Sequence, residues 1–161
     1  MNMYVLHVQT GRELLILREL KRKKIDAYVP QEVALLRNGG KWHEIERTLM
    51  PGYVFIKTEF NAAVYYTVKA VSGIIRFLGS PPTPLSDTEL EQMKWMLNDG
   101  EPIIPSEAIV EDDKLIITSG VLKGFEGNVI SFDRRRKRAT ALVSICGKEH
   151  EVTLSVDFKD S

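Results

Sequence analysis

A single cysteine, Cys146, leaves this chain of 161 residues without the second thiol that an intramolecular disulfide needs. No apolar run approaches the roughly 18 residues of a membrane-spanning helix, and the N-terminal residues lack the charged-then-apolar pattern of a secretory signal. The three histidines lie far apart, and no Cys/His spacing typical of a metal site occurs. We therefore expect a cytoplasmic protein with no membrane partner, no metal, no cofactor and no enzymatic activity.

The chain also lacks an excess of either charge, because 22 Lys and Arg residues balance 22 Asp and Glu residues. A neutral chain does not attract polyanions as a whole, so any nucleic-acid site must be a local patch. Two cationic clusters stand out, Lys21–Lys24 and Arg134–Arg138. The first falls at the end of an expected helix, where positive charge complements the helix dipole, although a nucleic-acid or partner contact stays open there.

Strand-like and helix-like patterns alternate in the N-terminal part of the chain. Residues rich in β-formers at 3–9, 53–57 and 74–78 predict strands, and residues 25–36 are also expected to be extended. Helical spacing follows Glu13, with Leu14, Leu17 and Leu20 in the first stripe. Asn61 can cap a second helix, and Ser86–Glu89 matches a capping box for a third. Asn38-Gly39-Gly40 predicts a tight hairpin with a charged, exposed return arm. The order β-α-β-β-α-β-α predicts a ferredoxin-like α+β sandwich with one extra helix.

A linker separates this part from the rest. Residues 98–111 contain Gly100, Pro102 and Pro105 and show little periodicity, which places a domain boundary near residue 105. Beyond it, apolar stretches at 115–118, 128–132, 140–145 and 149–154 predict four short strands and a small closed β-barrel. We therefore predict two domains, residues 1–105 and 106–161.

The densest charge run, Arg134–Arg138, falls on the expected hairpin between the second and third barrel strands. Five adjacent cations repel one another, which folding alone does not require, and a polyphosphate backbone would relieve that repulsion. Arginine also offers bidentate contacts and can stack on exposed bases. We predict an RNA-binding set with two neighbouring loop lysines: Arg134, Arg135, Arg136, Lys137, Arg138, Lys123 and Lys148. The alternative is a solvated hairpin that pairs with Asp133 and Glu149.

Both halves of the chain resemble the NusG family of transcription elongation factors. The N-terminal resemblance lies in Tyr4–Val8, Met50–Phe55 and Val71–Gly79, and the C-terminal one, to a KOW module, lies in Ser119–Gly127 and Val143–Lys148. It implies an NGN domain over residues 1–105 that binds the clamp helices of RNA polymerase. It also implies an SH3-like KOW β-barrel over residues 106–161 and no catalytic chemistry.

The resemblance nominates Tyr4, Leu49, Met50 and Tyr53 as polymerase-binding residues. An apolar patch with aromatic edges beside a Pro-Gly turn can seat against a helical hairpin. The alternative is that Met50 and Tyr53 are core residues at the start of a strand. DNA near the transcription bubble stays open as a further partner, and we expect the protein to act as a monomer.

Three departures from the family pattern indicate a specialised member. Residues 69–72 lack the polar Asn-Thr-Pro, Cys146 stands where an aromatic residue is common, and five cations fill the second barrel hairpin. This combination resembles the LoaP antitermination proteins, which implies an operon-specific factor whose KOW domain binds an RNA hairpin in the leader transcript. A general NusG-type elongation factor, an RfaH-like operon-specific regulator and a KOW-containing ribosomal or translation protein are the alternatives.

Overall fold

The computed structural model describes residues 1–159, which form two compact units. The first unit takes residues 1–29, 50–90 and 145–148, and the second takes residues 30–49, 91–144 and the chain from Glu149. The units thus interleave along the sequence. The division at residue 105 stays a prediction, and the last two residues of its C-terminal domain lie outside the described range.

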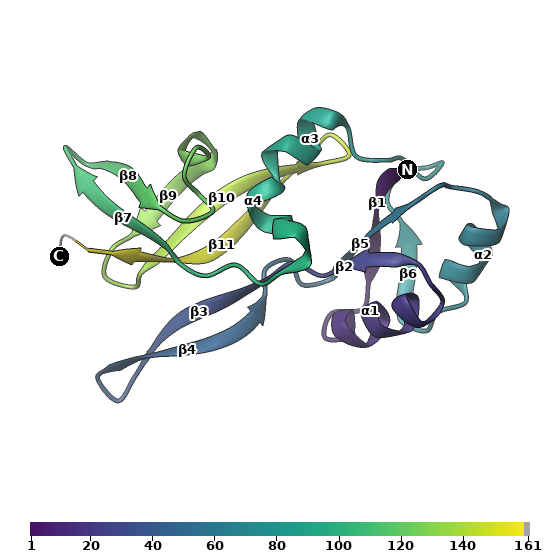
Figure 1. Ribbon diagram of the computed structural model, residues 1–161, viewed down its shortest axis with the longest axis horizontal. Coiled ribbons are helices and arrows are strands. Elements are labelled where there is room, and N and C mark those ends of the chain that lie inside the picture. Colours follow the sequence, from purple (N-terminus) through teal and green to yellow (C-terminus); the bar gives the residue numbers. More distant parts are fainter. Residues whose placement is uncertain (160–161) are drawn as a thin grey trace. The chain divides into compact units, whose positions relative to one another are not determined.

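In the first unit two helices cover a sheet (Figure 1). Its elements are β1 (Asn2–Val8), α1 (Glu13–Arg22), β2 (Asp26–Tyr28), β5 (Tyr53–Thr58), α2 (Ala62–Lys69) and β6 (Ile74–Phe77), and α3 (Asp87–Gln92) begins in it. The sheet order within the described residues is β2-β5-β1-β6. Strand β1 lies centrally and runs antiparallel to β5 and β6.

The core of the first unit lies between this sheet and its two helices. Ile16 and Leu20 of α1 and Val68 of α2 are buried in one cluster with Leu6 and Ile56 of the sheet. Leu14, which the sequence placed in the buried stripe, is 47% exposed, so that part of the prediction is wrong. The buried face follows the four-residue spacing of Ile16 and Leu20, because residues four apart lie on one side of a helix.

Capping residues set the starts of the later helices as predicted. The Val64 N–H donates to Asn61 Oδ1 at 2.9 Å at the start of α2. Before α3, the Glu89 N–H donates to Ser86 Oγ at 3.1 Å and the Ser86 N–H donates to Glu89 Oε1 at 3.0 Å, which is a reciprocal capping box. The single helix expected after Ser86 is instead two short segments, because the backbone leaves helical geometry at Met93 (φ −107°, ψ 11°).

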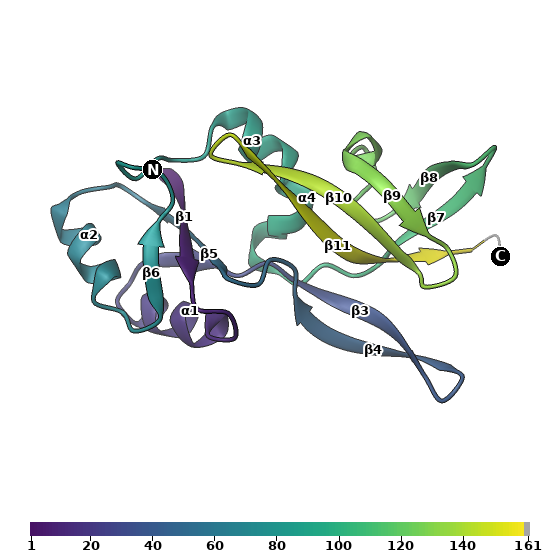
Figure 2. The same cartoon turned by 180° about the vertical axis from the view of Figure 1, so that it is seen from behind.

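The second unit is a curled β-sheet with a long two-stranded ribbon (Figure 2). Its elements are β3 (Gln31–Asn38), β4 (Lys41–Thr48), α4 (Lys94–Leu97), η1 (Asn98–Gly100), β7 (Ser106–Glu111), β8 (Lys114–Ser119), η2 (Glu126–Asn128), β9 (Val129–Asp133), β10 (Arg138–Ile145) and β11 (Lys148–Phe158). In the described chain the curled sheet has the order β8-β7-β11-β10-β9. The ribbon turns at Gly39-Gly40, as predicted, with Asn38 paired to Lys41.

Strand β7 lies within residues 98–111, which were predicted to be a linker. That part of the prediction is wrong, as is the expected number of four barrel strands. Residues 106–111 pair antiparallel with β8 and parallel with β11, so the described sheet has five strands. The α+β fold class is confirmed, with a helix-covered sheet first and a curled β-sheet after it. Among residues 1–159, no helix combines the length and apolar character that a bilayer crossing requires.

Candidate nucleic-acid interface

The cationic run lies where the sequence predicted it, in the turn between β9 and β10. Arg134, Arg135 and Arg136 are exposed, and Arg138 opens β10. The Arg136 N–H donates to Asp133 Oδ1 at 3.1 Å, and its guanidinium lies 3.8 Å from the same carboxylate. Asp133 therefore balances one charge of the turn at an exposed, strongly screened position, which leaves the turn cationic.

Lys137 differs from its neighbours because its side chain turns inward. Its Nζ lies 2.7 Å from Asp157 Oδ1, in a pair whose side chains are 22% and 24% exposed. The same ammonium lies 5.3 Å from the ring centroid of Trp42 on the ribbon. Lys137 thus joins the turn, β11 and the ribbon, so its first role is structural.

The Lys137–Asp157 pair should make the stability of the second unit depend on pH in the acid range. Burial alone would raise the pKa of Asp157, but hydrogen bonds and charges from Lys137 and Lys159 outweigh it and lower the pKa below its ordinary 3.8. A lowered folded pKa gives stability that is complete above the unfolded pKa and is lost as pH falls through the folded value. We expect Asp157→Asn to destabilise the second unit at neutral pH. The difference from wild type should shrink below about pH 4. Urea titrations at several pH values measure the difference in unfolding free energy between the variant and wild type. A difference that stays constant with pH would contradict this prediction.

A buried carboxylate holds the ribbon against the sheet. Glu32 is 1% exposed; its Oε1 accepts the Ser155 N–H at 2.9 Å and its Oε2 accepts Arg47 Nε–H at 2.8 Å. The Leu35 N–H donates to Ser155 Oγ at 2.9 Å, which adds a second link between β3 and β11. These two contacts join residues that are 123 and 120 positions apart in the sequence.

The charges that act on Arg138 do not balance. Burial lowers the pKa of Arg138; the positive charges of Arg47 and Arg136 lower it further, and only Glu32 acts in the opposite direction. Arg138 therefore lies in a field of excess positive charge. An anion bound beside it would relieve this repulsion.

The turn and the ribbon together line a groove of about 370 Å³. Its walls combine four arginines with apolar and aromatic side chains: Leu35, Leu36, Arg37, Trp42, Arg135, Arg136 and Arg138. Arg135, Arg136 and Arg138 were predicted from the sequence, whereas Arg37 and Trp42 were not. The only local signal was an aromatic residue set among cations just after the Asn38-Gly39-Gly40 turn.

The other two predicted RNA-binding lysines come from other segments of the chain. Lys123 precedes β9, whereas the cationic turn follows it. Lys148 follows the turn at the other end of β10, a strand of eight residues, and groups with the first unit. Neither is among the residues that line the groove, and their role in RNA binding stays a prediction.

The four predicted polymerase-binding residues do not share one face. Tyr4 belongs to the core cluster on the helix-covered face of the sheet, with its ring centroid 5.3 Å from that of Phe60. Tyr53 pairs with His7, and because side chains alternate along a strand these two lie on the opposite face. Leu49 and Met50 are buried, and Tyr53 is half-buried. Polymerase binding by these residues stays a prediction.

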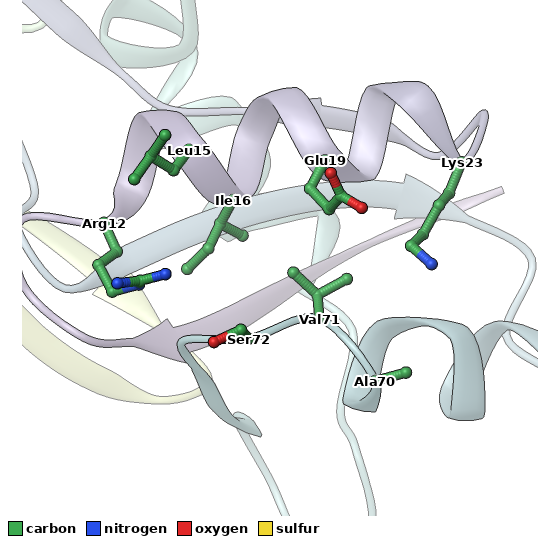
Figure 3. A pocket seen from close by; sticks show the side chains of 8 residues that line it. All are labelled: Arg12, Leu15, Ile16, Glu19, Lys23, Ala70, Val71 and Ser72. Carbon is green, nitrogen blue, oxygen red and sulfur yellow. The ribbon is translucent and has the colours of Figure 1, made fainter.

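A second cavity, of about 400 Å³, lies in the first unit between α1 and the end of α2 (Figure 3). Arg12, Glu19 and Lys23 give it charged walls, and Val71 and Ser72 come from the segment that departs from the family pattern. Two cations and one carboxylate leave a modest positive balance. Contact with DNA near the transcription bubble stays a prediction.

Cys146 lies in a tight turn in which both central residues have positive φ, 52° at Cys146 and 80° at Gly147. Its thiol donates to the Thr83 carbonyl at 3.5 Å, and the Gly147 N–H donates to Glu89 Oε2 at 2.9 Å. Burial and the Glu89 carboxylate both raise the pKa of the Cys146 thiol, which therefore stays protonated and weakly nucleophilic.

The chain thus combines a helix-covered sheet with a curled β-sheet that carries a guanidinium-rich groove, and no cluster of metal-ligating side chains occurs in residues 1–159. The family model for the transcription termination factor NusG matches residues 1–94, which is more than half of the chain. The chain therefore belongs to the NusG family of transcription termination and antitermination factors.

Individual relatives agree with this assignment. The chain is 29% identical to the transcription termination/antitermination protein NusG of Rickettsia typhi, over 94% of this chain and 85% of that protein. It is 28% identical to the NusG protein of Thermus thermophilus, over 94% of this chain and 93% of that protein. A solved structure of Thermotoga maritima NusG has the same fold, with a TM-score of 0.60, 22% identity and coverage of 96% and 93%.

Proposed function

We propose that the protein is an operon-specific, RNA-polymerase-associated antitermination factor that binds a structured RNA element in the leader transcript through the groove of its second unit. Membership of the NusG family supports the association with RNA polymerase. The clamp helices of the polymerase are the contact that the sequence resemblance implies. The observation that carries the RNA assignment is the convergence of Arg37, Arg135, Arg136 and Arg138 on one groove in a chain with no net charge.

Physical chemistry favours RNA as the ligand of this groove. Cations that neutralise phosphates release condensed counterions, which gives affinity that falls steeply with salt. The positive charges of Arg47 and Arg136 act on Arg138 and the carboxylate of Glu32 opposes them, so the groove carries more positive than negative charge. Folded transcripts present both clustered phosphates and unpaired bases, and arginine can contact each.

The test replaces the three exposed arginines of the turn by serine, Arg134→Ser, Arg135→Ser and Arg136→Ser, and keeps Lys137 and Arg138. Exposed contacts of about 1 kcal/mol each predict about a hundredfold loss of affinity for the leader hairpin. The slope of log affinity against log salt should fall by about 3. Filter binding over a salt series measures both, and co-purification with RNA polymerase should be unchanged.

A control variant removes the same charge elsewhere, with Lys21→Gln, Arg22→Gln and Lys24→Gln at the exposed end of α1. It should keep both the affinity and the salt slope. Equal behaviour of the two triple variants would sink the RNA assignment. Sequencing of RNA crosslinked to the protein in cells separates an operon-specific factor from a general elongation factor, since the latter would recover most transcripts.

A further inference from the structure

The geometry points to Trp42 as a stacking platform for one unpaired base of the bound RNA, with Arg37 and the arginines of the turn holding the adjacent phosphates. This inference rests on the proposed function. It adds an aromatic contact from Trp42 to the RNA site and specifies what the groove recognises. A duplex without an unpaired nucleotide would not satisfy it.

The ribbon places Trp42 beside cations from two directions. Arg37 is the direct cross-strand partner of Trp42, and its guanidinium carbon lies 5.9 Å from the indole centroid. Lys137 reaches the same ring from the turn, with Nζ 5.3 Å from the centroid, while it is fixed by Asp157. The indole is therefore positioned before any ligand binds, which reduces the entropy lost on binding.

The groove combines the two surfaces that a nucleotide needs. Leu35, Leu36 and Trp42 provide apolar and aromatic walls, and Arg135 and Arg136 provide positive charge. Its volume of about 370 Å³ falls in the range of about 300–1,000 Å³ found for small-ligand pockets. Stacking on an aromatic side chain is available to every base, so this platform selects an unpaired nucleotide rather than a sequence.

The exposure of Trp42 sets it apart from the other tryptophan of the chain. Trp95 is 2% exposed and belongs to the core of the second unit, whereas Trp42 is only half-buried and faces the groove. A partly exposed ring that lines the groove and lies near two cations is suited to contact with a ligand.

The experiment compares two probes of equal charge, a short oligouridine and an abasic ribose-phosphate oligomer of the same length, with the full chain. Wild type should bind oligouridine about tenfold more tightly than the abasic oligomer. Trp42→Leu should abolish that difference, because leucine offers no ring face on which a base can stack. Trp42→Phe keeps an aromatic face and should retain most of the preference. Trp95 remains in both variants and reports by its fluorescence that the second unit is folded.

The outcomes separate this inference from the proposed function. Equal binding of the two probes by wild type, or an unchanged preference in Trp42→Leu, would overturn the stacking site. The proposed function would still stand if the leader hairpin binds and the arginine triple variant weakens that binding. Absence of any binding by wild type to both probes and to the leader hairpin would overturn both.

Discussion

Gly120→Ala should destabilise the second unit by about 4 kcal/mol, from a strained backbone and a steric clash of about 1–3 kcal/mol each. Gly120 has φ +103°, a conformation that side chains rarely adopt. A Cβ there would lie 2.6 Å from Ser106 Oγ and 2.7 Å from Ser106 Cα. Since a folded domain is stable by about 5–15 kcal/mol, this change removes a large fraction of its stability.

The clash at Gly120 cannot be relieved by a small movement of Ser106. Ser106 is 1% exposed and begins β7, where it pairs with Val156 of β11. Its Oγ also accepts the Leu122 N–H at 3.1 Å. A displacement of Ser106 would therefore break pairing in the centre of the curled sheet.

Two nearby glycines provide matched controls. Gly124 has φ +92°, but a Cβ added there would meet no atom within 4 Å, so Gly124→Ala should lose only the backbone part, about 1–3 kcal/mol. Gly127 has open space and no such φ, so Gly127→Ala should be neutral or stabilising by up to about 1 kcal/mol. Urea denaturation followed by tryptophan fluorescence measures all three, because Trp42 and Trp95 both lie in the second unit. Equal losses at Gly120 and Gly124 would show that the Ser106 contact is unimportant.

Local patterns were sufficient for most elements of this fold. The Asn38-Gly39-Gly40 turn, the Asn61 cap and the Ser86–Glu89 capping box depend on neighbouring residues and were predicted from them. Strand β7 was missed because residues 106–111 follow Pro102 and Pro105, and because its partner β11 lies far along the chain. The buried face of α1 was misassigned because Ile16 and Leu14 fit two competing helical stripes.

The candidate site shows the same limit. The cationic turn was visible as a run in the sequence, and its hairpin position is confirmed by the pairing of Arg138 with Asp133. The contribution of Trp42 and Arg37 was not visible, because nothing near residue 42 indicates that it lies beside residue 137. Long-range contacts such as that of the buried Glu32 with Ser155 link the ribbon to β11, and no local pattern indicates them.

Glu32→Ala should therefore destabilise the second unit by about 3 kcal/mol and weaken RNA binding as well. Without the carboxylate, the buried Ser155 N–H loses its acceptor, which by itself costs about 1–3 kcal/mol. Arg47 loses its partner too, but its side chain is 32% exposed and water can replace part of that contact. The remaining penalty comes from Arg47 and Arg138, whose mutual repulsion Glu32 no longer opposes.

Two variants on the same ribbon make this prediction specific. Glu46→Ala removes an equal charge from an exposed position of β4 and should change stability by less than about 0.5 kcal/mol. Glu32→Gln keeps an acceptor for the Ser155 N–H but no charge for Arg47, so its loss should fall between the two. If Glu32→Ala and Glu46→Ala unfold at the same urea concentration, the ribbon is not held by this carboxylate. Other contacts would then have to hold the ribbon beside the cationic turn, because both of these links from β3 to β11 are made to Ser155.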